Sequence, residues 1–362
     1  MNNKQHNTQD GFTLVELVVA IGVMAMVVVF AGTVFKTSIA AYRVATAQAE
    51  IMHKFRAITD QLSSDFRGLR KNAPLFIWFQ LDPNDPNKRL DQIMFFADGD
   101  FQSVGQWANK TIVGNLARIQ YGQARSYDYR CKWTNDPQNL HGNYRLLARR
   151  QQISTTETDL NSWPDPYNFL NPLNPFNLHN NDLYEYDRFS LSQWQALTND
   201  LTNGPANVNQ IITACFISRP IVDLVDTNDP HMLMAEKVGS FSVQWSYSYI
   251  NAGQEYVYWW PSIDPGSSGN TTYSDFGSSG MNMNLNPFGF YFNTAAPAPS
   301  FSNWFSYSGA QGYYYPDPLL NPRNIANKPV YPQALKFTFT LYDSQGVFKD
   351  GQTFTHIVYL GD

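Results

Sequence analysis

The sequence has little charge and few cysteines, and it lacks the short motifs that mark common enzyme classes. Charged residues make up 15% of the 362 residues and the formal net charge is −5, so no basic patch indicates nucleic-acid binding. There is no His-Glu-x-x-His, Cys-x-x-Cys, Gly-x-Ser-x-Gly or P-loop motif, any of which would indicate an enzyme or a metal or nucleotide site. We therefore expect no enzymatic activity, no metal and no cofactor.

Two short segments carry ligands that cations favour. Asp98-Gly99-Asp100 offers carboxylate oxygens but lacks the ligand pattern of an EF-hand, so we predict a turn. His231 follows two aspartates in Asp226-Thr227-Asn228-Asp229-Pro230, and a solvated turn is again preferred over a metal site. The two cysteines, Cys131 and Cys215, fit either one disulfide in an oxidising compartment or two unpaired buried thiols.

The N-terminal region contains a long apolar run. Residues 17–35 hold no charge and no proline, and at about 1.5 Å per residue they nearly cross a hydrocarbon core of about 30 Å. The carboxylate of Glu16 directly precedes this run, and near the bilayer interior it costs about 2.5–3.5 kcal/mol unless it is paired. The sequence therefore predicts a membrane helix whose first carboxylate needs a partner.

A secretory signal peptide is the competing interpretation of this segment. Its apolar core spans about 7–15 residues and precedes an Ala-x-Ala-like cleavage site. Here the run is longer and ends in Phe35-Lys36-Thr37 without such a site. A plain single-pass anchor without processing is the remaining alternative.

Gly11-Phe12-Thr13-Leu14-Val15-Glu16 and the apolar run resemble the N-terminus of type IV prepilins and type II secretion pseudopilins. The resemblance implies that a prepilin peptidase removes residues 1–11 by cutting between Gly11 and Phe12, and that the new amine of Phe12 is N-methylated. It also implies that Glu16 pairs with the terminal ammonium of a neighbouring subunit during assembly. Gly22 and Gly32 would let the apolar helices approach closely.

After the apolar run, hydrophobic residues recur every three or four positions, which predicts an amphipathic helix. They are Ile39, Tyr42, Ala45, Ala49, Met52, Phe55, Ile58, Leu62, Phe66 and Leu69. We expect one continuous rod that Asn72-Ala73-Pro74 ends. The expected division is a leader at 1–11, a transmembrane half-helix at 12–35, an amphipathic half-helix at 36–71 and a head at 72–362.

The head is predicted to be β-rich, because short aromatic and β-branched segments alternate with turns. We expect strands at 75–81, 92–97, 117–122, 143–152, 214–219, 238–250, 255–260, 334–342 and 352–360. Residues 153–210, with a short helix at 191–199, and residues 262–330 lack regular periodicity and are predicted to be loop insertions at the sheet edges. The predicted fold class is pilin-like α+β, with the long helix packed on an antiparallel β-rich head.

Aromatic residues gather in the second half of the head. They include Tyr247, Tyr249, Tyr256, Tyr258, Trp259, Trp260 and residues 313–315. Packing across a sheet is the preferred interpretation, and a subunit interface or a sugar-binding platform are the alternatives.

The order of the head segments resembles that of minor pseudopilins of the J type in type II secretion systems. The similar stretches are 61–67, 92–96, 116–121 with 144–149, 238–245 with 259–261, and 332–337. This resemblance implies a structural subunit at or near the tip of a pseudopilus, and its partners would be other minor and major pseudopilins and an inner-membrane assembly platform. It also implies a single-pass inner-membrane protein with a periplasmic head. The alternative is a type IV pilus subunit that acts as a surface adhesion or binding module.

Overall fold

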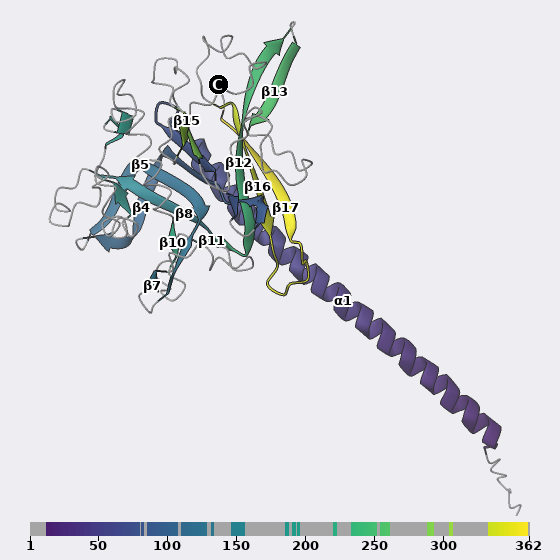
Figure 1. Cartoon of the computed structure of the whole chain (residues 1–362). Helices are drawn as coiled ribbons and strands as arrows, with labels where there is room; N and C mark the ends of the chain where they lie inside the picture. Colours follow the sequence, from purple (N-terminus) through teal and green to yellow (C-terminus); the bar gives the residue numbers. More distant parts are fainter. Residues whose placement is uncertain are drawn as a thin grey trace, which may run out of the picture.

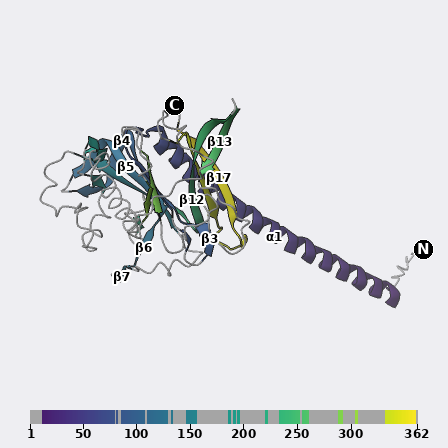
Figure 2. The ribbon, with the colours of Figure 1, turned by 45° about the horizontal axis from the view of Figure 1, so that its top comes forward.

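A computed structural model describes residues 12–79, 81–82, 85–107, 110–128, 132–133, 146–155, 185–187, 190–192, 194–195, 220–222, 233–251, 254–260, 288–292, 304–306 and 332–360. One long N-terminal helix packs through its second half on a β-rich head, and its first half leaves the head as a free rod (Figures 1 and 2). This arrangement confirms the predicted α+β fold class.

The helix α1 (Leu14–Arg67) runs without a break through the apolar and the amphipathic segments. Its buried residues are Ala47, Ile51, Ile58, Thr59, Leu62, Asp65 and Phe66. The predicted apolar face of the amphipathic helix is therefore confirmed from Phe55 onward, where Phe55 packs against the core. It is wrong earlier, because Ile39 and Tyr42 lie on the part of the helix that has left the head and are exposed.

The helix ends at Arg67, a few residues before the predicted end near residue 70. Gly68 caps it, and a Cβ at this position would stand 2.0 Å from the carbonyl oxygen of Asp98. Only glycine lets the chain approach β4 (Gln92–Trp107) this closely. The amide of Asp98 donates to the carbonyl of Gly68 at 2.7 Å, so the turn is fixed to the sheet before Pro74 is reached.

The head contains two main sheets, which are antiparallel apart from one short strand. The larger has the order β11-β8-β5-β4-β1-β14-β15, with β9 parallel to β8. Its strands are β1 (Leu75–Phe79), β4 (Gln92–Trp107), β5 (Lys110–Gln123), β8 (Leu146–Ser154), β9 (Tyr186–Asp187), β11 (Leu233–Glu236), β14 (Phe288–Phe292) and β15 (Trp304–Ser306). The smaller has the order β13-β12-β16-β17, formed by β12 (Val238–Asn251), β13 (Gln254–Trp260), β16 (Ala334–Leu341) and β17 (Gln352–Tyr359).

Two minor groups of strands complete the described head. β2 (Leu81–Asp82) pairs with β3 (Asp85–Arg89), and β6 (Arg125–Asp128) lies between β10 (Ile221–Val222) and β7 (Lys132–Trp133). The β6–β10 pair is parallel.

The main core lies between the helix and both sheets. The Phe66 ring stacks on Phe95 of the larger sheet at 4.2 Å between centroids and contacts Phe337 of the smaller sheet at 5.6 Å. Further along the helix, Phe55 stacks on Phe354 at 4.7 Å. The helix therefore joins the two sheets into one hydrophobic unit.

Several strand predictions are confirmed and others need correction. β16 shows the expected alternation of buried and partly exposed residues. Asp98-Gly99-Asp100 does not form the predicted turn, because β4 runs through it with a shift of register between Asp98 and Phe101. The insertions are also more ordered than predicted, since β9 lies within the first and β14 and β15 lie within the second. The strand expected at 214–219 lies outside the described residues.

The face of the larger sheet that points away from α1 is polar yet buried. It carries Arg118, Gln120, Arg150 and Gln152, each at most 6% exposed. Arg118 pairs with Asp187 at 3.1 Å between Nε and Oδ2 and lies 4.9 Å from the centre of the Trp194 ring. Residues of the first insertion therefore cover this face. They include helical residues within the segment 191–199, where a short helix was predicted.

Candidate functional site: the helix N-terminus and the helix–head junction

The first turn of α1 holds Glu16 in a capping box. Thr13 is the N-cap, with φ −74° and ψ 150°, and its hydroxyl oxygen accepts the amide of Glu16 at 3.3 Å. In return, Oε2 of Glu16 accepts the backbone amide and the hydroxyl of Thr13 at 3.0 and 2.9 Å. This reciprocal arrangement satisfies two donors at the helix end. Both bonds use Oε2, and no described residue donates to Oε1.

Thr13 is part of the N-terminal motif, but its role as the helix cap was not predicted. Thr13-Leu14-Val15-Glu16 has the Thr-x-x-Glu spacing of a capping box directly before an apolar run, so the signal was present. Glu16 therefore has a local partner in the isolated chain. Its pairing with an ammonium of a neighbouring subunit stays a prediction, as does the modification of Phe12, whose side chain is 90% exposed. Gly11 lies outside the described residues.

The apolar surface of the first half of α1 is not used by the rest of the described chain. Every residue from 12 to 46 is exposed, and α1 is long and apolar enough to cross a membrane. A Cβ at Gly22 or Gly32 would meet nothing within 4 Å. Neither glycine is therefore needed for packing within the described chain, which leaves close helix–helix approach as a prediction.

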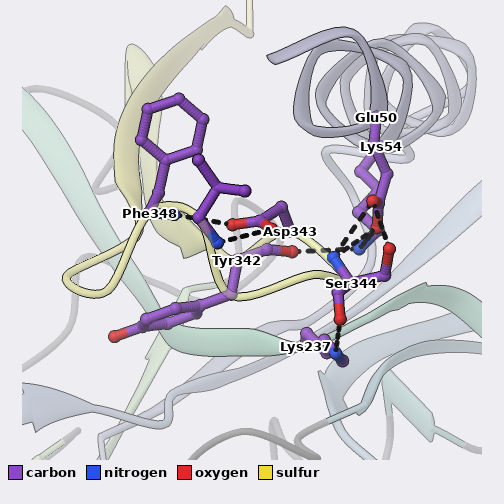
Figure 3. Close-up of polar contacts among 8 residues, drawn as sticks. Glu50, Lys54, Lys237, Tyr342, Asp343, Ser344 and Phe348 are labelled. Carbon is purple, nitrogen blue, oxygen red and sulfur yellow. Dashed lines mark hydrogen bonds and ion pairs between the residues drawn. The ribbon is translucent and has the colours of Figure 1, made fainter. Parts of the chain in front are cut away.

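The helix enters the head at a polar clasp between α1 and the β16–β17 connection (Figure 3). The amide of Ser344 donates to both carboxylate oxygens of Glu50 at 3.0 Å, and its hydroxyl donates to Oε2 at 2.7 Å. Lys54 bridges Glu50 at 2.7 Å and the carbonyl of Tyr342 at 3.0 Å. Partial burial would raise the pKa of Glu50, but the bonds from Lys54 and Ser344 outweigh it and lower the pKa. We call these four residues the clasp.

Asp343 organises the turn that carries the clasp (Figure 3). Its two carboxylate oxygens accept the amides of Val347 and Phe348, both at 2.9 Å. Burial opposes ionisation, but these backbone bonds lower the pKa of Asp343. Gly346, with φ +67°, supplies the left-handed conformation that the turn needs. The turn that presents Ser344 to the helix is therefore held by bonds within its own backbone segment.

Deeper in the head, Asp65 joins α1 to the larger sheet through buried polar bonds. Arg149 of β8 forms a two-point ion pair with it, at 2.7 and 2.9 Å, and the hydroxyl of Tyr121 of β5 donates to the same carboxylate. Burial and the charge of Asp65 raise the pKa of Tyr121 well above its ordinary value. Burial disfavours the charged form of Arg149, but Asp65 outweighs it and raises the pKa. The segments 61–67, 116–121 and 144–149 therefore meet at this cluster.

The other candidate sites of the sequence analysis are not assembled in the described part of the chain. Asp98 pairs with Arg70 at 2.7 Å, and no group of three or more His, Cys, Asp or Glu among the described residues could hold a metal ion. Cys131, Cys215 and His231 lie outside the described residues, as do residues 313–315.

The β12–β13 hairpin is described through its backbone, and among its aromatic side chains those of Trp245 and Trp259 are described. The register opposes Trp245, Tyr247 and Tyr249 of β12 to Trp260, Tyr258 and Tyr256 of β13. Trp245 is buried in the core, which agrees with packing across a sheet at that position. Lys336 lies 4.7 Å from the centre of the Trp259 ring.

Comparison with known proteins identifies the N-terminal segment. Residues 6–32 match the prokaryotic N-terminal methylation motif. No curated protein and no solved structure matches the chain. The motif supports membership of the type IV prepilin-like superfamily, as a pilin or a pseudopilin, in a class of proteins that are structural rather than enzymatic. It also implies processing by a prepilin peptidase, pilin-like assembly and single-pass anchoring.

Proposed function

We propose that the chain is a structural minor pseudopilin of a type II secretion system, of the J type, that assembles at or near the tip of the pseudopilus. The observation that carries the proposal is a methylation motif followed by an apolar half-helix that its own head does not cover. An apolar surface of this size needs lipid before assembly and other apolar helices afterwards.

Processing comes first in the proposed sequence of events. The prepilin peptidase removes the leader, residues 1–11, and the amine of Phe12 becomes a methylated ammonium. Before this step, residues 12–35 anchor the chain in the bacterial inner membrane, and residues 72–362 form the periplasmic head. The exposed position of Phe12 at the helix tip supports access by the peptidase.

Assembly then transfers the apolar helix from lipid to the filament. The Oε1 atom of Glu16 meets the ammonium of a neighbouring subunit, which offsets the cost of about 2.5–3.5 kcal/mol for a carboxylate near the bilayer interior. The capping bonds on Oε2 hold the side chain in position. Gly22 and Gly32 allow neighbouring helices to pack closely. The partners are other minor and major pseudopilins and the inner-membrane assembly platform.

The clasp and the Asp65 cluster support a mechanical role for the second half of α1. Glu50 and Asp65 lie about four turns apart on the helix at about 3.6 residues per turn. Glu50 bonds to the β16–β17 connection of the smaller sheet, and Asp65 bonds to β8 of the larger sheet. Movement of the helix during assembly would therefore carry both sheets together.

The N-terminus of the membrane-extracted protein tests the proposal directly. Intact-mass analysis should find a chain that begins at Phe12 and carries one methyl group, and cells without the prepilin peptidase should keep the full leader. Deletion of the gene that encodes this chain should abolish the export of secreted proteins, while surface pili remain. An unprocessed chain in peptidase-positive cells would refute the proposal.

A type IV pilus subunit with a binding role is the second candidate. The observation in its favour is that β14 and β15 of the second insertion extend the larger sheet beyond β1, which enlarges the head. Detergent-purified full-length protein on a glycan array separates the two. Specific binding, together with loss of surface pili on deletion, would favour this candidate over the secretion role.

A further inference from the structure

β17 is an edge strand of the smaller sheet that lacks the usual protection. Among the described residues, no strand pairs with its outer side. Native proteins protect such edges with short strands, bulges, proline or charged side chains. β17 instead pairs with β16 over all eight residues without a register shift. It has no proline, Asp, Glu, Lys or Arg, and its histidine, His356, contacts Ser63 of α1.

The other edges of the two main sheets carry such protection. β11 has four residues, the charged residue Glu236 and a register shift between Leu233 and Ala235. β9 and β15 have only two and three residues. β13, at the opposite edge of the smaller sheet, contains Glu255. Within the described head, β17 is therefore the edge that is most open to the addition of a strand.

β17 lies where α1 leaves the head (Figure 1). The side-chain amide of Gln352, the first residue of the strand, donates to Oε1 of Gln48 at 2.8 Å. Directly before this point, every residue of α1 from 12 to 46 is exposed. The open edge therefore continues the uncovered surface of the helix, and a subunit that packs on the free half of α1 is in position to meet β17 as well.

The side chains of β17 also favour a partner beside the strand. Phe354 stacks on α1, while the residues that alternate with it face solvent on the other side of the sheet. They are Thr353, Thr355, Ile357 and Tyr359. Tyr359 is 78% exposed and Ile357 is 38% exposed. A neighbouring strand would cover part of this apolar surface while it pairs with the outer backbone groups.

The direction of β17 limits which strand can join it. Gln48 contacts Gln352 at the start of β17, and Ser63, further along α1, contacts His356. β17 therefore runs along α1, away from the apolar end of the helix. All pairings in this sheet are antiparallel, and an antiparallel neighbour would consequently run toward the membrane. Because anchored subunits have parallel helices, the partner strand must run against its own helix.

We propose that β17 accepts an edge strand from the head of a different pilin-type subunit, which lies beside this chain at or near the filament tip and whose strand runs toward the membrane. Backbone hydrogen bonds would supply the affinity, and side chains beside Ile357 and Tyr359 would supply the specificity. The inference rests on the proposed function, because a minor subunit has other subunits as neighbours. It adds that the heads join through a shared sheet as well as through helices.

Photo-crosslinking of the full-length chain in filament-assembling cells tests the pairing. Two copies with different epitope tags are produced together, one of them with benzoylphenylalanine in place of Ile357. Irradiation should give an adduct that carries only the tag of the photoreactive copy. Mass spectrometry should identify its other member as a different protein with a methylated N-terminus of the prepilin type. Benzoylphenylalanine at Val104, which is 58% exposed in β4 of the larger sheet, should not give this adduct.

A second photoreactive position tests the direction of the partner strand. Thr353 is exposed on the same face as Ile357, and benzoylphenylalanine at either position should link to the same strand of the partner. In an antiparallel pair, the partner residue linked to position 353 follows the residue linked to position 357 in the partner's sequence, by about four residues. The reverse order would show a parallel pair and would overturn the proposal.

A charge on the edge provides a further arm of the test. Thr355→Lys should abolish the adduct because a lysine at an edge opposes strand addition, whereas Thr355→Val should preserve it. Val113→Lys places the same charge on β5, where Val113 is 66% exposed, and should also preserve it.

Processing, filament incorporation and export are measured in the same cells. A processed and incorporated chain that gives no adduct, or an adduct with a protein that is not of the prepilin type, overturns the strand addition and leaves the proposed function intact. An adduct that carries both tags shows that copies of this chain are neighbours and overturns the pairing with a different subunit. An unprocessed chain overturns the proposed function together with the pairing that rests on it.

Discussion

Two substitutions separate the capping bonds of Glu16 from its predicted pairing with an ammonium. Glu16→Gln keeps an oxygen that can accept the capping bonds from Thr13 but removes the charge that would pair with an ammonium. Glu16→Ala removes both. We expect both variants to stay in the membrane fraction and to be lost from sheared filaments, because the missing charge is the common defect. Unchanged incorporation of Glu16→Gln would show that capping, rather than charge, is what assembly needs.

The head provides an internal control for this test. Glu16 lies 31 positions before Ala47, the first buried residue of α1, so neither variant should change the denaturant midpoint of the head. Thr13→Ala, which keeps the charge and removes the cap, should weaken the helix end by about 0.5–2 kcal/mol and reduce incorporation less than Glu16→Gln does.

The Asp65 cluster allows a sharper prediction about stability. Arg149→Met leaves the buried carboxylate of Asp65 without its two-point partner. Loss of one member of a buried ion pair costs about 3–5 kcal/mol, so the unfolding free energy of the head should fall by this amount in a urea titration. Tyr121→Phe removes one hydrogen bond and should cost about 1–3 kcal/mol.

The exposed pair of Arg70 and Asp98 is the matched control for Arg149→Met. Its side chains are 39% and 50% exposed, and such pairs contribute about 0–1 kcal/mol. Arg70→Met should therefore change the urea midpoint little. Equal effects of the two substitutions would contradict the assignment of Asp65 and Arg149 as a buried support.

These residues also show what the sequence can predict. Glu16 was recognisable because a carboxylate beside an apolar run is locally anomalous, and local spacing contains the Thr13 signal as well. Arg149 lies 84 positions from Asp65, and no local pattern indicates that the two meet. The segments that contain Asp65 and Arg149 could be noted in the sequence, but only the fold shows that the two residues form one cluster.

Among the elements, the long helix and the alternating strands were predictable, and the edges of the larger sheet were not. The 3–4 spacing of the helix and the Phe-Thr-Phe-Thr alternation of β16 are strong local signals. β14, with the sequence Phe-Gly-Phe-Tyr-Phe, has no polar alternation and lies in a segment rich in Gly and Asn. Asp98-Gly99-Asp100 has turn composition but lies in a long strand, because pairing with β5 on both sides of the shift outweighs local preference.

The clasp and the Asp343 turn that carries it should make the head sensitive to acid. The folded-state pKa values of Glu50 and Asp343 lie below their ordinary values of 4.5 and 3.8. A carboxyl with a lowered pKa contributes stability above its unfolded-state pKa and loses it as the pH falls through the folded-state value. The urea midpoint should therefore decrease as the pH drops below about 4.5, where the unfolded chain begins to take up more protons.

Removal of the two carboxylates isolates this contribution. Glu50→Gln with Asp343→Asn should have a lower midpoint than the unaltered chain at about pH 6 and should approach it at about pH 3. Glu50 is partly exposed, with 28% of its side chain accessible, so its share should be about 1 kcal/mol or less. His356 is present in both chains, and its titration cancels in the comparison. Parallel pH profiles would exclude the two carboxylates as the source of acid sensitivity.

At the scale of the whole molecule, α1 divides into a half that the described head leaves exposed and a half that packs on the head. Every residue from 12 to 46 is exposed, while Ile51, Ile58, Leu62 and Phe66 contribute to the core. Removal of residues 1–35 should therefore release the chain from the membrane without lowering the urea midpoint of the head.

Removal of residues 1–58 also deletes Ile51, Phe55 and Ile58, and large-to-small changes at such core positions cost about 2–5 kcal/mol each. We expect the longer truncation to unfold the head, as measured by circular dichroism and proteolysis. A head that loses stability with the first truncation would show that the apolar half-helix supports its own fold, contrary to a role in assembly alone.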